Sequence, residues 1–391
     1  MFFVGSLILL GCDRFEDIGP EEGETAEIRP ASQEDKEMGE ANLKFDLDLF
    51  RIMHKEEDED VNVLISPLSI QTAMNITVNG AKGSTKEEIL ENIHSNRWTV
   101  EEINEIQQKW RKLLTDYSGR PVFKEANSFF KDPDRLHAKE DFADTIKEYY
   151  GAQKETLDFD DEQHSLELIN GWVEEVTDGM IDELVGYIDN NDLAFLVNAL
   201  YFDVDWKEEF DPDNTSDRAF HYPDDSSDDI PFMQAREEDQ MFSSQRGLIA
   251  LDKLFEDSTF RLTGIMPTEV TLDELVDELN SGYIHGLYNE MNYREANLYL
   301  PKMDIGYGEE IDPYLGKIGM EQTFVNRAPD LSAMGSSRRG GGLFISRVDH
   351  ESVLEIDEEG GEGAAATSEE ASKKVKHATK NHLRSSFFLV T

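Results

Sequence analysis

The chain has 391 residues, of which 38% are apolar and 10% aromatic, enough to build a substantial core, so this composition excludes wholesale disorder. Its 37 Lys and Arg against 84 Asp and Glu give a net charge of −47, which excludes nucleic acid as a partner, because phosphate binding requires clusters of Lys and Arg. The single cysteine, Cys12, excludes an intrachain disulfide.

The acidic residues are spread along the whole chain rather than gathered in one segment. This distribution favours adaptation to high salt, where charge repulsion is screened over about 3 Å at 1 M. The alternative is an acidic face that binds a basic partner. On the first interpretation we expect the fold to lose stability at low ionic strength, and equal thermal midpoints in dilute buffer and in molar salt would contradict it.

The N-terminal stretch, MFFVGSLILLGC, is apolar and too short to span a bilayer. It resembles a bacterial or archaeal lipoprotein signal, in which a small residue precedes the cysteine that becomes lipidated, here Cys12. Residues 1–12 are therefore predicted to be a signal peptide, and residues 13–38 an acidic flexible tether. The protein would be extracellular or at the cell surface, held to the membrane only through the lipid anchor.

This N-terminal stretch lacks the Lys or Arg that normally begins a signal peptide. Two alternatives therefore stay open. In the first, the start of the chain is mis-assigned and the protein is cytoplasmic. In the second, the stretch is an ordinary N-terminal strand. The remaining chain, residues 39–391, contains no other segment near the ~20 apolar residues of a membrane helix.

Helices are predicted mainly in the first half of the chain and strands in the second. Apolar residues at helical spacing occur between 41 and 55, and Ser66-Pro67 marks the start of a further helix. Apolar runs at 193–202, 260–267, 296–305 and 342–359 predict strands. This order, with no internal repeat, indicates a single α+β domain.

No enzyme motif is present. The sequence contains no H-E-x-x-H, Walker loop or G-x-S-x-G, and its nine His lack metal spacing. Gly361-x-Gly363-x-x-Ala366 imitates a dinucleotide fingerprint but lacks the acidic residue that should follow. The acids of 211–217 are spaced like a calcium loop, but Ser216 replaces its Gly and Tyr222 its Glu. We therefore expect no catalytic activity, cofactor or metal.

The stretch EEGGEGAAATSEEASKKVKH, residues 358–377, combines a run of Gly and Ala with three lysines in a strongly acidic chain. Small residues of this kind can form a flexible linker. They can also form a segment that must fit a narrow space, where larger side chains would clash.

From about residue 40 to its end the chain resembles the serpin family. The matching segments occur in order along the sequence: SPLSIQTAMNITVNGAKGST with Ser66, EANSFF, INGWVEEVTDGMIDELV with Asn170, Trp172 and Thr177, LVNALYFDVDWKEEF with Asn198, Phe202 and Trp206, YLPKM, LGKIGMEQTF, and LFISRVDHESVLEIDEEGGEGAAAT with His350.

The resemblance implies a serpin fold. This is a single α+β domain with a large central mixed sheet, a second and third smaller sheet, eight or nine helices and an exposed reactive-centre loop at about 358–380. It also implies a monomeric protease inhibitor in which a serine protease cuts the loop, forms an acyl-enzyme and is trapped when the loop inserts into the sheet. Together with the lipoprotein signal and the acidity, it indicates a prokaryotic, salt-loving source.

The family's loop length implies that the cut falls at Lys374–Val375, with Lys373 and Lys376 as near alternatives. A lysine before the cut suits a trypsin-like pocket, and the lysine cluster also suits a subtilisin-like protease. The implied hinge comprises Glu358, Glu359, Gly360, Gly361, Glu362, Gly363, Ala364, Ala365, Ala366 and Thr367. In an inserted strand Gly361, Gly363, Ala365 and Thr367 would face the packed side, and Glu362, Ala364, Ala366 and Ser368 would face solvent.

Three features depart from the family pattern. Gly361 replaces the usual Thr or Ser, Gly363 replaces the usual Ala, and Glu369 would fall on the packed side of the strand. The chain also stops at Thr391, about twenty residues before the family's usual end, so we expect a C-terminal strand to be missing. These departures leave open a non-inhibitory serpin with a binding or structural role, whose loop is cut as a simple substrate.

Overall fold

The structure is a computed structural model of the chain. It describes residues 2–5, 32–58, 61–115, 122–222, 226–244, 246–256, 260–325, 329–369 and 387–390. Cys12, residues 13–31 of the predicted tether and the predicted reactive bond with Lys373, Lys374, Val375 and Lys376 lie outside these residues. The end of the predicted tether was wrong, because α1 (Gln33–Glu56) begins within it and buries Asp35 and Met38.

Helices dominate the first half of the described chain, as predicted. These are α1 (Gln33–Glu56), α2 (Pro67–Gly80), α3 (Gly83–Asn92), α4 (Val100–Thr115), α5 (Glu140–Tyr150) and α6 (Glu162–Val176). The second half of the described chain adds the shorter helices α7 (Leu272–Glu278), α8 (Ser281–Glu290) and α9 (Asp312–Ile318). Two of the starts have clear local causes. Ser32 caps α1 in a reciprocal capping box with Asp35, and Ser66 caps α2 with Pro67 in its first turn.

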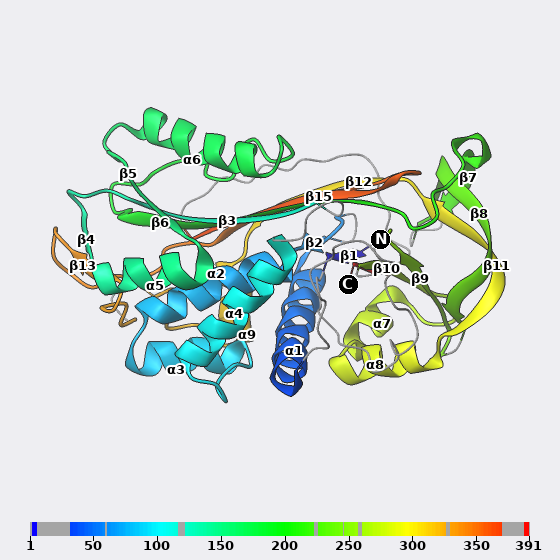
Figure 1. The fold of residues 1–391 in the computed structure, drawn as a ribbon, viewed down its shortest axis with the longest axis horizontal. Helices are drawn as coiled ribbons and strands as arrows, with labels where there is room; N and C mark the ends of the chain where they lie inside the picture. Colours follow the sequence, from blue (N-terminus) through cyan, green and yellow to red (C-terminus); the bar gives the residue numbers. More distant parts are fainter. Residues whose placement is uncertain are drawn as a thin grey trace, which may run out of the picture.

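The central sheet has six strands in the order β12-β14-β15-β6-β3-β5. Their bounds are β3 (Val122–Lys131), β5 (Gln153–Thr156), β6 (Ala194–Asp205), β12 (Met303–Glu310), β14 (Asp349–Ile356) and β15 (Gly360–Glu369). Only the β3–β5 pair is parallel among the pairings of this sheet, which makes it mixed, as expected. Helix α6 lies on one face of the sheet, and α2, α4 and α5 lie on the other (Figure 1).

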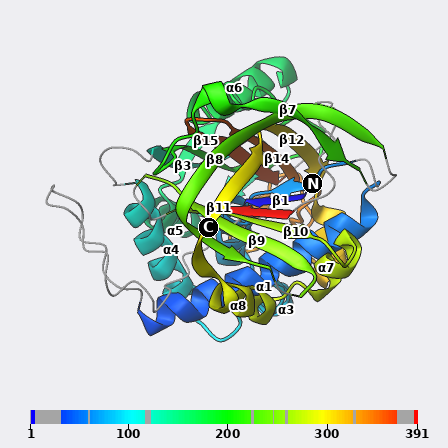
Figure 2. The ribbon, with the colours of Figure 1, turned by 90° about the vertical axis from the view of Figure 1, so that its right-hand side faces the viewer.

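A second sheet has eight strands and a third has two. The second contains β1 (Phe2–Gly5), β2 (Leu64–Ile65), β7 (Ser216–His221), β8 (Ser227–Ser243), β9 (Leu248–Leu254), β10 (Arg261–Pro267), β11 (Asn292–Pro301) and β16 (Phe387–Val390). The third pairs β13 (Gly335–Ser337) with β4 (Leu136–Ala138). The second sheet is therefore not smaller than the central one in strand number. Figure 2 shows its strands side by side, with α7 and α8 beside them.

The two ends of the chain meet in the second sheet. Phe2–Gly5 pairs in parallel with Phe387–Val390 on one side and with Leu64–Ile65 on the other. Figure 2 shows β1 among the strands of this sheet, with the N and C labels on opposite sides of it, as expected for a parallel pair formed by the first and last strands. The alternative of an N-terminal strand thus agrees with the structure, whereas lipidation at Cys12 stays a prediction.

Within the described residues no helix is both long enough and apolar enough to cross a membrane. The same residues contain no group of three or more His, Cys, Asp or Glu placed to hold a metal ion.

Candidate functional site

Residues 360–369, expected to lie in an exposed loop, form β15 in the middle of the central sheet. β15 is antiparallel to both of its neighbours, with Gly361 opposite Ile356 of β14 and Val204 of β6. We call the space between β6 and β14 the insertion site. The chain is uncut, so the insertion site is filled by the protein's own hinge.

Three residues of β15 are glycines at which atoms around the insertion site leave no room for a Cβ atom. A Cβ atom on Gly360 would collide with the main-chain oxygen of Val204. A Cβ on Gly361 would lie 2.9 Å from Cδ1 of Ile356, and one on Gly363 would lie 2.5 Å from Cε1 of Phe202. Because real Cβ contacts are not this short, any larger residue at 361 or 363 would require the neighbouring side chains to move.

The packed face of β15 agrees with the sequence prediction. Gly361 and Gly363 meet side chains of the main core, and Thr367 is fully buried against α2. The register continues this face to Glu369, which lies opposite Leu196. The strand period of two thus assigned the core-facing residues correctly.

The opposite face of β15 was predicted to face solvent, and this was wrong for three of its four residues. Ala364, Ala366 and Ser368 are buried. The two alanines belong to an apolar cluster formed with α6 and the segment that follows it. Only Glu362 keeps partial exposure, and its carboxylate accepts a hydrogen bond from the Tyr201 hydroxyl at 2.7 Å. Small residues are therefore needed on both faces.

A buried polar network receives Thr367. The Thr367 hydroxyl lies 2.7 Å from Nδ1 of His350 and 2.9 Å from the hydroxyl of Ser69. The backbone N–H of Ser66 donates to Nε2 of His350, so Nδ1 carries the proton of the neutral ring. Burial lowers the pKa of His350 to about 3, and the ring stays neutral under ordinary conditions.

The start of β15 is fixed by a tight turn. The backbone N–H of Asp357 donates to the Gly360 carbonyl, and the Asp357 side chain accepts from the N–H groups of Glu359 and Gly360. The Trp206 indole donates to the Asp357 carbonyl at 2.8 Å and stacks on Phe255. This turn is the point at which the chain reverses from β14 into β15.

Glu358 is held at the same end of the insertion site. Its carboxylate accepts from Nζ of Lys302 at 2.5 Å and from the Thr215 hydroxyl at 2.7 Å. Burial raises the pKa of Glu358, but these hydrogen bonds outweigh it and the pKa falls below its usual value. Lys302 and Thr215 were not identified from the sequence, because nothing local indicates that they approach residue 358.

A profile of the family described as "Serpin (serine protease inhibitor)" matches residues 40–390 of this chain. The chain belongs to the serpin family. Serpin A3-1 of Bos taurus is 30% identical over 84% of this chain and 79% of its own length. Serpin B3 of Homo sapiens is 30% identical over 84% of this chain and 88% of its own.

Solved serpin structures confirm the fold. The thermophilic serpin tengpin, in the latent state, matches with a TM-score of 0.77 at 26% identity over 86% of this chain and 90% of its own. Emu ovalbumin matches with a TM-score of 0.80 at 22% identity over 88% of this chain and 93% of its own. Serpins are typically protease inhibitors, and the family also includes members without this activity.

The residues that match the family's sequence motifs make structural contacts around the insertion site. Asn170 binds the backbone of Leu184 and Val185, and Thr177 binds that of Ile181, which together hold the segment after α6 on the sheet. Trp172 contacts Phe130 edge to face. These contacts fix α6 and the segment after it as one apolar layer, and Ala364 and Ala366 of β15 belong to the same buried cluster.

Asn198 lies on β6 directly opposite Thr367. Its amide donates to the Asn127 side chain at 3.0 Å, and the Asn127 amide donates to the Tyr150 carbonyl at 2.9 Å. This chain of amides ties the insertion site to β3 and α5, and it is fully buried.

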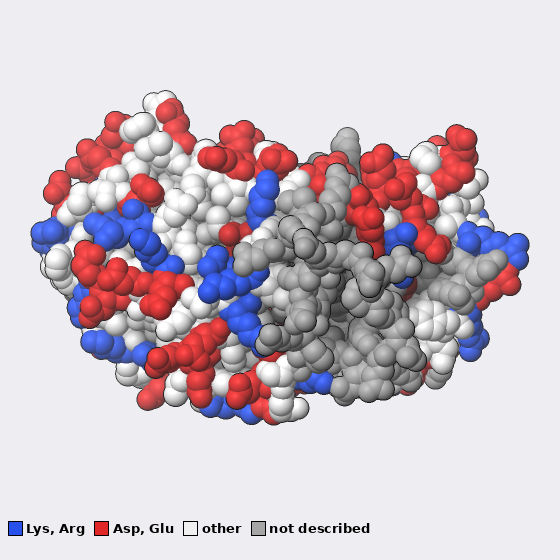
Figure 3. Space-filling model, viewed as in Figure 1, with Lys and Arg blue, Asp and Glu red and all other residues white. Residues whose placement is uncertain are grey.

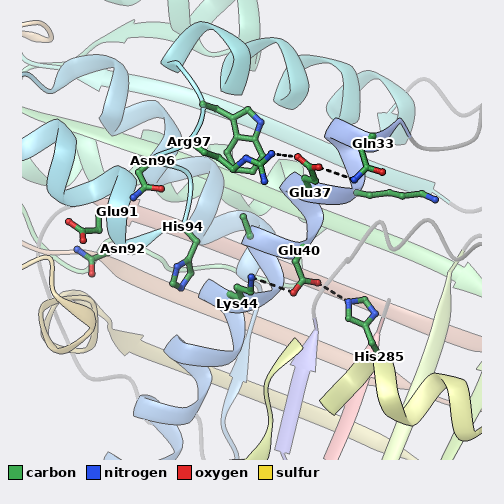
Figure 4. A pocket seen from close by; sticks show the side chains of 13 residues that line it. Gln33, Glu37, Glu40, Lys44, Glu91, Asn92, His94, Asn96, Arg97 and His285 are labelled. Atoms are coloured by element: carbon green, nitrogen blue, oxygen red, sulfur yellow. Dashed lines mark hydrogen bonds and ion pairs between the residues drawn. The ribbon is translucent and has the colours of Figure 1, made fainter. Parts of the chain in front are cut away.

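A separate cavity of about 750 Å³ lies away from the insertion site, between α1, α8 and the segment after α3. Figure 4 shows two groups of paired charges in its lining: Glu37 pairs with Arg97, and Glu40 pairs with Lys44 and His285. Because acidic and basic side chains are mixed in the lining, the cavity gives no support for a ligand of one charge.

Proposed function

We propose that this serpin is a single-use inhibitor of serine proteases that cut after lysine. The protease serine would attack the carbonyl carbon of Lys374, form an ester with it and release Val375 as the new N-terminus of the C-terminal fragment. Residues 360–369 would then enter the insertion site and carry the bound protease with them. A trypsin-like or subtilisin-like protease, acting on a monomeric serpin, is the proposed partner.

The observation that carries this proposal is how closely the residues of β15 fit the insertion site. All residues from 360 to 368 except Glu362 are buried, the three glycines match close walls, and Thr367 completes a polar network. A loop that served only as an exposed protease substrate would not need small residues on both faces of an inserted strand. The fit supports a segment selected for insertion.

One observation favours the alternative, a non-inhibitory serpin. The uncut chain already holds residues 360–369 in the sheet, and in this conformation no further insertion of these residues can trap a protease. An inhibitor would have to act from a second conformation in which they lie outside the sheet.

The deciding experiment is to incubate the protein with trypsin and with subtilisin in molar salt and to run a denaturing gel. A band near the sum of the two masses, absent when the protease serine is chemically blocked, would support trapping. Mass spectrometry of the released peptide would show whether it begins at Val375. Cleavage near Lys374 without such a band would support the non-inhibitory alternative.

We further propose export and lipid anchoring through Cys12. The support is the sequence Leu9-Leu10-Gly11-Cys12 after an apolar stretch. Mass spectrometry of the protein expressed in a bacterial or archaeal host would reveal a diacylglyceryl group on an N-terminal Cys12, and a mature chain that still begins at Met1 would contradict the proposal.

A further inference from the structure

β15 lies beneath a layer of chain that must separate from the sheet before the strand can enter. This layer consists of α6 and the segment after it, residues 177–193, and we call residues 162–193 the cover. The side chains of Ala364 and Ala366 are buried in the apolar cluster that the cover forms with the sheet. Because this cluster is closely packed, a strand entering between β6 and β14 can place these two side chains only if the cover first moves away.

The cover forms a hairpin of chain that runs along the insertion site and back. We call the end of the site where β15 begins the near end, and the end where it stops the far end. Just after α6, Oδ1 of Asp178 lies 3.6 Å from Nζ of Lys124, in the part of β3 toward the near end. The cover then returns to the far end, where β6 begins at Ala194 opposite Lys131, the last residue of β3. The tip of the hairpin is therefore residues 177–179.

Arg135 fastens both legs of this hairpin at the far end. It follows β3 and is only 1% exposed. Its Nη2 donates to the Asp160 carboxylate at 2.5 Å, and its Nη1 donates to the carbonyl oxygens of Asp189 and Asp192 at 3.0 and 3.1 Å. Its Nε lies 3.0 Å from the Asp132 carboxylate, which belongs to the turn after β3. One buried side chain thus joins the start of the cover, the end of the cover and the sheet.

The tip of the cover is held by a much weaker contact. The side chains of Asp178 and Lys124 are 62% and 43% exposed. An exposed ion pair stabilises little, whereas breaking a buried one by removing a partner is strongly destabilising. Nζ of Lys124 also lies 4.6 Å from the centroid of the Tyr201 ring, and the Tyr201 hydroxyl donates to Glu362 near the start of β15. The weakly held tip therefore lies on the side from which β15 begins.

We propose that Arg135 is the hinge of the cover, and that the cover opens at its tip to admit or release β15. Arg135 is thus a positioning residue for loop insertion, because it keeps both legs of the cover in place while the tip lifts. The direction of opening matches the strand, since the first residues of β15 lie at the near end. This inference rests on the proposed function, in which the strand must enter before the acyl-enzyme hydrolyses.

The test compares two crosslinks in a Cys12→Ser background, which removes the chain's own cysteine. Lys124→Cys with Asp178→Cys fastens the tip. Asp160→Cys with Arg339→Cys fastens the far end, where the two native side chains lie 3.9 Å apart and are both exposed. Each pair of cysteines is joined with a bis-maleimide, and the same protein before crosslinking is its control.

Two measurements separate the crosslinks. Fastening the tip should lower the ratio of trapped to cleaved protein with trypsin at least about tenfold, because hydrolysis then precedes insertion. It should also slow amide hydrogen exchange of residues 361–368 in the uncut protein at least about tenfold, because these amides exchange through local opening that frees β15. The far-end crosslink should change neither quantity. Equal effects of the two crosslinks, or no effect of the tip crosslink, would overturn the proposal.

Arg135→Gln tests the hinge itself. Without the contacts of Arg135 the cover can open from the far end, so the tip crosslink should no longer slow exchange in β15. Slow exchange that persists in this variant would show that Arg135 stabilises the fold without acting as the hinge. If Arg135→Gln does not fold, Asp160→Asn replaces it, since this change removes only the partner of Arg135 that is 72% exposed.

The exchange measurement does not depend on trapping. If the wild type forms no covalent complex but the tip crosslink slows exchange in β15, the inhibitory function fails and the hinge stands. If the wild type traps trypsin and the tip crosslink changes neither quantity, the hinge fails and the inhibitory function stands.

Discussion

At the scale of single residues, Gly363 and Phe202 form one unit. Phe202 fills the space that a Cβ atom on residue 363 would need. Glycine inside a strand costs about 0.5–1 kcal/mol of stability relative to alanine, because its unfolded backbone has more conformational freedom. The structure shows a compensating side chain on the neighbouring strand, which no local pattern around residue 363 could have revealed.

We therefore expect Gly363→Val to convert the inhibitor into a substrate. A branched side chain there would meet Phe202 and Leu354, delay insertion and let the acyl-enzyme hydrolyse. The ratio of trapped to cleaved protein on a denaturing gel should fall at least about tenfold, a change equivalent to roughly 1.4 kcal/mol in the competition between the two outcomes. Glu362→Gln, on the partly exposed opposite face, should leave the ratio unchanged. Undiminished trapping by Gly363→Val would refute the assignment of this wall.

Asp349 makes the stability of the fold depend on pH. Its pKa is about 8 when folded and near 3.9 when unfolded, and the groups facing it are Arg347, Glu310 and Asp312. The folded state therefore binds more protons between about pH 4 and 8. The contribution of this site to the free energy of unfolding is present below pH 4 and is lost as the pH rises to 8, by at most about 1.4 kcal/mol per pH unit.

Denaturant unfolding at several pH values between 5 and 9 in molar salt would measure this dependence. Asp349→Asn should make the slope of stability against pH less negative between pH 5 and 8, and part of the slope should remain because burial also raises the pKa of Glu125 and of Glu351 to about 7. Asp217→Asn, at an exposed position on β7, is the matched control and should keep the wild-type slope. Parallel curves for the wild type and Asp349→Asn would show that the carboxyl is not held neutral by burial.

At the scale of elements, the sequence predicted several strands correctly but not how the strands and helices pack together. The apolar runs predicted β6, β10 and β14, and the period of two predicted which residues of β15 share a face. It could not predict that α6 and the segment after it bury the other face, since this layer comes from residues 162–188 and depends on tertiary contacts of Asn170 and Thr177. Nor could it show Lys302 beside Glu358.

The apolar layer formed by α6 and the segment after it has a consequence for Ala366. This residue is completely buried in the cluster to which that layer belongs. Ala366→Gln should therefore reduce the trapped fraction, because the longer polar side chain cannot be accommodated in this cluster. If the face were open to solvent, as the sequence indicated, the variant would trap like the wild type. Ala366→Gly keeps the space and should retain trapping, which separates crowding from any other effect of changing the residue.

At the scale of the whole molecule, the acidic composition determines the charge of the surface, and the N-terminal stretch takes part in pairing the two ends of the chain. Asp and Glu are spread over the visible face with Lys and Arg between them, and no single acidic patch dominates (Figure 3). The salt interpretation and the alternative of a basic partner both stay predictions. The ends meet where β1 lies between β16 and β2. β1 is part of the predicted signal peptide, so its removal would change this sheet.

Lipidation at Cys12 requires removal of residues 1–11, and this would also remove β1. A chain that begins at Cys12 would leave β16 and β2 without the strand that both pair with, and their freed backbone groups would lose hydrogen bonds. We expect this chain to unfold at a lower denaturant concentration than the full chain. Full-length Cys12→Ser keeps β1 while preventing lipidation, and its midpoint should equal that of the full chain. If the chain beginning at Cys12 is as stable as the full one, β1 is not an integral strand, and the N-terminal stretch is free to serve as an export signal.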